Sequence, residues 1–159
     1  QVRQLLQEKD VQVTEDNVAA IQTADVVVFA VKPQVLAQVL KPLNGLFAGK
    51  LVISIVAGAE ISTISKLLGT DQVVRVMPNT PALVQTGAHG LYATDAVAEK
   101  DRNLASQVLA ATGLTIWVNT EAQIDAVTAV SGSGYSCNDT HSADSSILKY
   151  VLHLQSAYP

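Results

Sequence analysis

The stretch ADVVVFAVKPQVLAQVL, Ala24 to Leu40, decides the fold class of this chain. Its first part, Val26 to Val31, is a short apolar run rich in β-branched residues, which is typical of a parallel strand buried on both faces. The run stops at Lys32-Pro33, and proline's fixed φ and missing N–H suit the first turn of a helix. The residues that follow at helical spacing predict one buried stripe, on Val35, Leu36, Val39, Leu40 and Leu43. Open α/β sheets bind ligands where strands break into helices, so the stretch predicts a nucleotide-binding α/β domain.

Strand-like and helix-like segments alternate along the rest of the chain. We expect further strands at 51–58, 73–77, 87–94 and 114–118, and helices at 17–23, 34–43, 60–68, 99–112 and 121–130. Asp16 or Asn17 can cap the first helix, and Gly69 can end the third. Such alternation is typical of βαβ units with right-handed crossovers. The sequence therefore predicts a Rossmann-like, doubly wound, mainly parallel sheet.

Composition narrows the function classes. The chain has 159 residues, long enough for one domain with a sizeable core, and a formal charge of −4. That charge and a pI near 5.2 argue against a nucleic-acid-binding surface. No apolar run approaches the roughly 18–20 residues that span a bilayer, and the first ten residues lack the apolar core of a signal peptide. The single cysteine, Cys137, excludes an intrachain disulfide framework. We expect a soluble, cytoplasmic protein.

Residue spacing alone assigns no reaction. The three histidines, His89, His141 and His153, share no metal-ligand spacing, so no metal site is expected. The Gly132-Ser133-Gly134 turn lacks both a third glycine and a preceding strand, and is better explained as a helix end than as a phosphate cradle. Asp125 is expected to be a surface charge of its helix rather than a catalytic base.

Polar and small residues at the predicted strand ends have two interpretations. Lys32 is either a point charge for a phosphate or ribose, or a solvated residue at a strand edge. Asn79 and Thr80 either shape a proline-stiffened turn or face a bound ring. The small residues around Ala57 and Gly58 permit either a ligand or a packed helix to approach the backbone. These residues indicate an α/β ligand site and leave its chemistry open.

Four sequence blocks carry a resemblance to a known family. They read ADVVVFAVKPQV, LVISIVAGAEISTI, VVRVMPNTPALVQTGAHGLYA and EAQIDAVTAVSGSG, and they extend from about Asn17 to Gly134. In order and spacing they resemble the pyrroline-5-carboxylate reductases. The resemblance implies an amino-terminal Rossmann domain for NADPH or NADH and a carboxyl-terminal helical domain that forms a homo-oligomer. It also implies the last step of proline synthesis, in which 1-pyrroline-5-carboxylate accepts a hydride and becomes L-proline.

The resemblance also implies cofactor-binding positions, which follow the matching motifs. Asn17 matches a residue beside the adenosine half of the cofactor. The turn Ala30, Val31, Lys32 and Pro33 matches positions whose backbone lines the dinucleotide. Ile55, Val56 and Ala57 match positions close to the nicotinamide ribose. Met77, Pro78, Asn79 and Thr80 match the loop beside the nicotinamide ring. No catalytic residue and no metal ligand is carried over.

The chain departs from the family pattern at both ends. The resemblance implies that the family's first strand, its glycine-rich phosphate loop and its selector for the 2′-phosphate would lie upstream of Gln1, so we expect these residues not to reveal the choice between NADPH and NADH. After Gly134 the family's apolar helices give way to a different sequence, as a change of reading frame or splice would produce. We therefore expect a partial NAD(P)-binding domain at 1–130, followed by an interdomain turn and divergent tail at 131–159.

These departures predict a fragment that lacks its first strand and its helical dimerisation domain. Such a fragment would expose an apolar sheet edge and would show no reductase activity by itself. The alternative is a catalytically silent Rossmann remnant that acts, if at all, as a binding or interaction module. A β-hydroxyacid or prephenate-type dehydrogenase would need a catalytic lysine or histidine after the sheet, and none is placed there.

Overall fold

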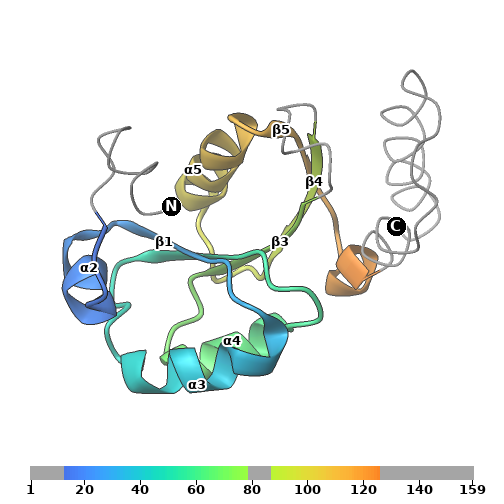
Figure 1. The fold of residues 1–159 in the computed structure, drawn as a ribbon. Coiled ribbons are helices and arrows are strands. Elements are labelled where there is room, and N and C mark those ends of the chain that lie inside the picture. Colours follow the sequence, from blue (N-terminus) through green and yellow to red (C-terminus); the bar gives the residue numbers. More distant parts are fainter. Residues whose placement is uncertain (1–12, 79–86, 126–159) are drawn as a thin grey trace.

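A five-stranded sheet organises the residues that the computed structural model describes, which are 13–78 and 87–125. Its strands lie side by side in chain order: β1 (Val26–Phe29), β2 (Leu51–Ser54), β3 (Val73–Met77), β4 (Gly87–Ala93) and β5 (Gly113–Trp117). β1, β2 and β3 run parallel, β4 runs antiparallel to β3, and β5 runs parallel to β4 (Figure 1). The predicted Rossmann-like, mainly parallel α/β fold is confirmed.

Helices cover both faces of this sheet. α3 (Leu36–Leu40) and α4 (Ile61–Leu68) lie on one face, and α5 (Glu99–Ala110) lies on the other (Figure 1). α2 (Asn17–Thr23) precedes β1, and two short 3-10 turns, η1 (Pro33–Val35) and η2 (Lys41–Leu43), flank α3. Each face has its own apolar core: Phe29, Leu40, Val52 and Ile64 belong to one, and Ile53, Val74, Leu91 and Ala105 to the other.

Local sequence explains most of these elements. β2 (LVIS) is buried along its whole length, as expected of a parallel strand covered on both faces. Asp16 caps α2, because its Oδ1 accepts hydrogen bonds of 3.0 Å from the amides of Val18 and Ala19. α4 ends at Gly69, whose left-handed φ of 71° lets its amide bond the carbonyl of Ser65.

Several expected boundaries differ from the observed ones. The first two strands end at Phe29 and Ser54, earlier than the apolar runs do, because the residues beyond leave the ladder to form turns. The expected helix 34–43 is three short helical pieces, since Pro42 lacks the N–H that a continuous α-helix needs. The last expected helix is helical over 121–125, and its remainder lies outside the described residues.

The expected burial of the first strand on both faces is wrong in the described structure. There β1 pairs with β2 alone, so it lies at the end of the strand order. Val28 is 47% exposed, and Val35, expected in the buried stripe of the next helix, is 39% exposed. The anticipated apolar sheet edge is therefore present among the described residues. In that part of the chain, no helix combines the length and apolar character that a membrane crossing requires.

The left-handed residue that ends α4 gives a stability prediction. Gly69→Ala is expected to lower the free energy of unfolding by about 1–2 kcal/mol, because a Cβ is disfavoured at φ 71°. Gly69→Asn is the matched control, since asparagine tolerates this conformation better and should lose less. Urea unfolding measures both, and equal losses for alanine and asparagine would contradict the backbone explanation.

Candidate functional site

The carboxyl ends of three parallel strands define the candidate site. β1, β2 and β3 run the same way, with Phe29 opposite Ser54 and Ser54 opposite Arg75 in the ladder. The segments that follow β1 and β2 therefore leave the sheet at one edge, and the Ile55 amide still bonds the Phe29 carbonyl at 3.1 Å. This is the edge at which α/β sheets bind ligands.

A cleft of about 430 Å³ opens between α3 and α4 at this edge. Pro33 and Leu36 line one side, and the turn Ala57–Glu60 with Thr63 of α4 lines the other. Ala57 is exposed, and a Cβ built on Gly58 would meet nothing within 4 Å, so the turn presents open backbone to the cleft. The volume falls in the range of small-molecule sites, about 300–1,000 Å³.

The predicted residues around this cleft differ in exposure. Pro33 and Ala57 line it, which brings together two motifs that lie 24 positions apart in the chain. Ala30 and Lys32 are exposed and Val31 is partly exposed, whereas Val56 is 3% exposed and packs into the core. Ile55 is partly buried and packs on the α5 side of the sheet. The amides of Ile55 and Val56 are already bonded, to the Phe29 carbonyl and to Oγ of Ser54, so the exposed turn at Ala57 and Gly58 is the part of this segment open to a ligand.

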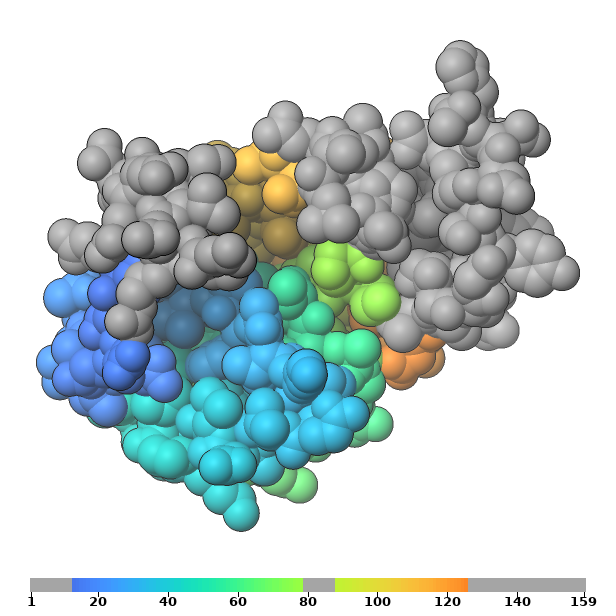
Figure 2. Space-filling model, in the orientation of Figure 1, coloured from blue at the N-terminus to red at the C-terminus, as the bar shows by residue number. Residues whose placement is uncertain are grey.

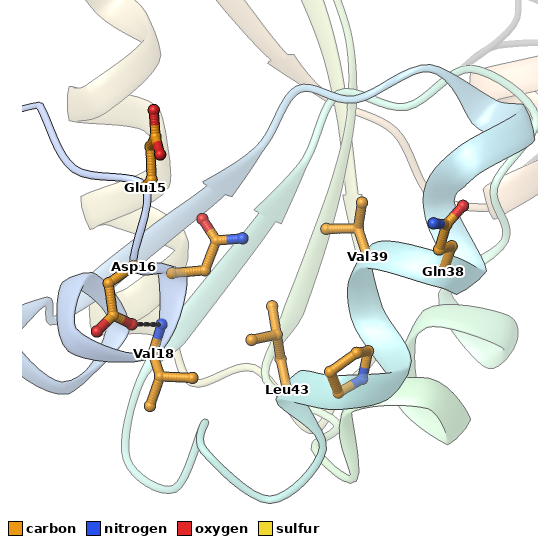
Figure 3. A pocket seen from close by; sticks show the side chains of 8 residues that line it. Glu15, Asp16, Val18, Gln38, Val39 and Leu43 are labelled. Carbon is orange, nitrogen blue, oxygen red and sulfur yellow. Dashed lines mark hydrogen bonds between the residues drawn. The ribbon is translucent and has the colours of Figure 1, made fainter.

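Asn17 lies in a second hollow of about 610 Å³, between the start of α2 and the later part of α3. Figure 3 shows Val39 and Leu43 pointing from the α3 side toward Asp16 and Val18 of the α2 side. In Figure 2, α2 (dark blue) and α3 (light blue) lie on the same face of the molecule. The two hollows adjoin the same helix but have no lining residue in common.

The last predicted group follows β3. Met77 ends this strand and packs against the small apolar cluster of Val118 and Ile124. Pro78 is partly exposed, and Asn79 and Thr80 lie outside the described residues. Both interpretations of these two polar residues therefore stay predictions.

The structure contains a buried ion-pair network that the sequence patterns did not predict. Arg75, in the middle of β3, is 1% exposed. Its Nη1 lies 3.0 Å from Oε1 of Glu121, and its Nη2 pairs with Oδ1 of Asp125. Asp125 is exposed, as expected, but its role as a partner of Arg75 was not foreseen. One feature of the sequence could have predicted this network, namely the charged residue inside the apolar strand VVRVM, because a buried guanidinium requires an anionic partner.

His89 is a second buried ionisable group, on β4. Its Nε2 lies 2.9 Å from Oγ1 of Thr112, whose hydroxyl donates to the Leu109 carbonyl, so we assign the ring proton to Nε2. Nδ1 has no hydrogen-bond partner. Burial lowers the pKa of His89 below its ordinary value of 6.5, and a backbone hydrogen bond at Thr112 acts in the opposite direction. His89 therefore acts as a neutral packing residue.

The site offers binding surface rather than a reactive side chain. Among the described residues, no three histidine, cysteine, aspartate or glutamate side chains group closely enough to hold a metal ion. A mainly parallel sheet with open backbone and a cleft at its strand ends defines the chain as a Rossmann-like domain of the nucleotide-binding class.

Comparisons with known proteins identify the family. The family model "NADP oxidoreductase coenzyme F420-dependent" matches residues 1–58. The pyrroline-5-carboxylate reductase of Haemophilus influenzae is 48% identical over 126 residues, which are 78% of this chain and 46% of the relative. The chain belongs to the pyrroline-5-carboxylate reductase family and corresponds to its amino-terminal, NAD(P)-binding domain.

Solved structures agree with this assignment. A pyrroline-5-carboxylate reductase from Coxiella burnetii matches with a TM-score of 0.77 and 36% identity, over 98% of this chain and 54% of that one. The Plasmodium falciparum pyrroline carboxylate reductase, solved with NADP bound, shares the fold with a TM-score of 0.72 at 24% identity, over 92% of this chain and 61% of that one. This chain spans about half the length of the curated relatives it matches.

The buried histidine predicts a pH dependence of stability. Because the folded pKa of His89 lies below 6.5, the unfolded chain takes up a proton first as the pH falls. The contribution of His89 to the free energy of unfolding is therefore fully present above about pH 6.5. Below that pH it declines by at most about 1.4 kcal/mol per pH unit. Urea unfolding at pH 7.5 and 5.5 measures the decline.

His89→Gln is the matched control for this prediction. Glutamine does not titrate, so the variant should lose less stability between the two pH values than the unaltered chain. All other titratable groups are common to both proteins and cancel in the comparison. Equal losses would show that His89 does not carry the effect.

Proposed function

We propose that this chain supplies the dinucleotide-binding half of a pyrroline-5-carboxylate reductase. NADPH or NADH would lie along the carboxyl ends of β1, β2 and β3. The observation that carries the proposal is the cleft between α3 and α4, in which Pro33 of one family motif faces Ala57 of another. Identity of 48% to a reductase over 126 residues supports the same site in both proteins.

The described residues fit such a cofactor. Open backbone at Ala57 and Gly58 admits a flat ring or a ribose at close range, because no side chain beyond Cβ stands in the way. Pro33 and Leu36 supply apolar surface opposite that turn. Lys32 is exposed beside the cleft, where its ammonium group can meet a phosphate or ribose oxygen.

The remaining predicted positions complete the proposed cofactor path. Asn17 would contact the adenosine half from the hollow beside α2. Ala30 and Val31, which follow β1, would line the dinucleotide. Ile55 and Val56 would offer backbone groups near the nicotinamide ribose. Met77 and Pro78, together with Asn79 and Thr80, would flank the nicotinamide ring.

The proposed reaction reduces the C=N bond of 1-pyrroline-5-carboxylate to give L-proline. When bound, the nicotinamide would supply a hydride to the imine carbon, which accepts it readily once the ring nitrogen is protonated. The residues of this half hold the ring in place, and proximity of about 3–3.5 Å between the reacting atoms accounts for much of the rate. The substrate's carboxylate, its nitrogen and any partner subunit would be met by residues outside this half.

A chimera tests the proposed function. Residues 17–125 of this chain would replace the matching segment of the Haemophilus influenzae reductase, whose remaining sequence supplies the other half. We expect the chimera to form proline from 1-pyrroline-5-carboxylate, with oxidation of NADPH and NADH followed separately. The 159-residue chain alone is expected to show no turnover, because it spans 46% of that relative.

The outcomes of this assay are distinguishable. The unaltered relative controls for assay conditions, and circular dichroism controls for folding of the chimera. A folded chimera that binds neither nucleotide would overturn the cofactor site. A folded chimera that binds nucleotide but forms no proline would support a catalytically silent domain instead.

A further inference from the structure

The buried Arg75 joins two distant segments of the chain. It lies in β3, and its two partners, Glu121 and Asp125, lie 46 and 50 positions further along the sequence. The Arg75 side chain is 2% exposed, whereas those of Glu121 and Asp125 are 27% and 56% exposed. Because a guanidinium so deeply buried is costly without anionic partners, the 121–125 segment must stay against β3.

Glu121 has a second contact that Asp125 lacks. Its Oε1, the atom that accepts from Arg75, also accepts a 2.8 Å hydrogen bond from the amide of Ile61. Ile61 is the first residue of α4, and the preceding Glu60 provides no side-chain cap. A carboxylate at this position also interacts favourably with the helix dipole. Glu121 therefore joins β3 to the start of α4, and Figure 1 shows the orange segment 121–125 at that end of the helix.

The start of α4 is also one wall of the cofactor cleft. The turn Ala57–Glu60 runs directly into Ile61, and Ala59 and Ile61 are both packed into the core. The Ala59 amide bonds the Val56 carbonyl at 3.3 Å, which closes the turn directly before the helix. Any shift of Ile61 would move this wall relative to Pro33 on the other side of the cleft.

The same segment 121–125 supports the end of β3. Met77 lies two positions after Arg75, on the same face of the strand, and packs with Ile124 and Val118. The segment thus contacts the two chain regions that flank the proposed nicotinamide position, one through Glu121 and the other through Ile124.

We propose that Glu121 is a positioning residue of the cofactor cleft: by binding Arg75 and the Ile61 amide through one carboxylate oxygen, it fixes the Ala57–Glu60 wall against β3. This rests on the proposed function, because it assumes that the cleft holds the nicotinamide end of NADPH or NADH. Glu121 acts through the wall that it holds and needs no contact with the cofactor.

The test compares three variants, each made in the chimera that joins residues 17–125 of this chain to the remaining sequence of the Haemophilus influenzae reductase. Glu121→Ala removes both contacts, and Glu121→Gln keeps a neutral acceptor of the same reach. Asp125→Asn is the matched control, because it weakens the other partner of Arg75 without touching α4. Amide hydrogen exchange at Ile61 and the dissociation constant for NADPH, measured by titration calorimetry, are the two readouts.

We expect Glu121→Ala to speed exchange at Ile61 and to weaken NADPH binding, each by about tenfold, as for the loss of one hydrogen bond to a charged group. Glu121→Gln should restore most of both properties, and Asp125→Asn should change each less than twofold. Thermal unfolding is recorded in parallel, because a merely structural role would make affinity follow stability in all three variants.

The possible failures separate the two proposals. If the chimera with unaltered residues 17–125 binds NADPH and its Glu121→Ala variant binds it equally well, the positioning role is wrong and the proposed function stands. The positioning role is also wrong, with the proposed function intact, if Asp125→Asn weakens binding as much as Glu121→Ala does. If the folded chimera with unaltered residues 17–125 does not bind NADPH, the cofactor site and the positioning role both fail.

Discussion

Parallel pairing of β1, β2 and β3 is the constraint on which the site depends. Parallel strands end on the same edge of a sheet, so the segments after Phe29 and Ser54 emerge side by side although they lie 25 positions apart. Parallel pairing therefore brings Pro33 and Ala57 to opposite sides of one cleft. The short apolar strands are therefore as important to the site as the residues that line it, since they contribute its geometry rather than its contacts.

The buried charge of Arg75 is a second constraint on the structure. An apolar residue at this position would pack in the core without requiring a particular neighbour. A guanidinium needs acceptors in defined places, and Glu121 and Asp125 supply them from one short segment. The ion pairs thereby fix where the chain lies after β5, which hydrophobic contacts with Val118 and Ile124 alone would determine less sharply.

The sequence predicted those features that depend on neighbours along the chain. β3 (Val73–Met77) and the end of α4 at Gly69 agree with their patterns, because burial and capping there are local. The direction of β4 was not predictable from alternation, since antiparallel and parallel strands can share one pattern. The partners of Arg75 were missed because they lie 46 and 50 positions away. Exposure of Val28 depends on which strand lies beside β1, which no local pattern encodes.

The position of β1 determines what this part of the chain can contribute to binding. In doubly wound sheets a dinucleotide lies where the strand order reverses, and strands on both sides of that point hold it. Among the described residues the order runs one way from β1 to β5, and the exposed Val28 marks the side of β1 that they leave open. The binding surface that the described residues provide is consequently the α3–α4 side, where Pro33 and Ala57 present apolar surface and open backbone to the cleft. Under the proposed function, phosphate recognition, and with it the choice between NADPH and NADH, would fall to residues on the opposite side. The part of the site that these residues control is therefore the position of the Ala57–Glu60 wall, which in the proposed function would determine where a nicotinamide ring rests.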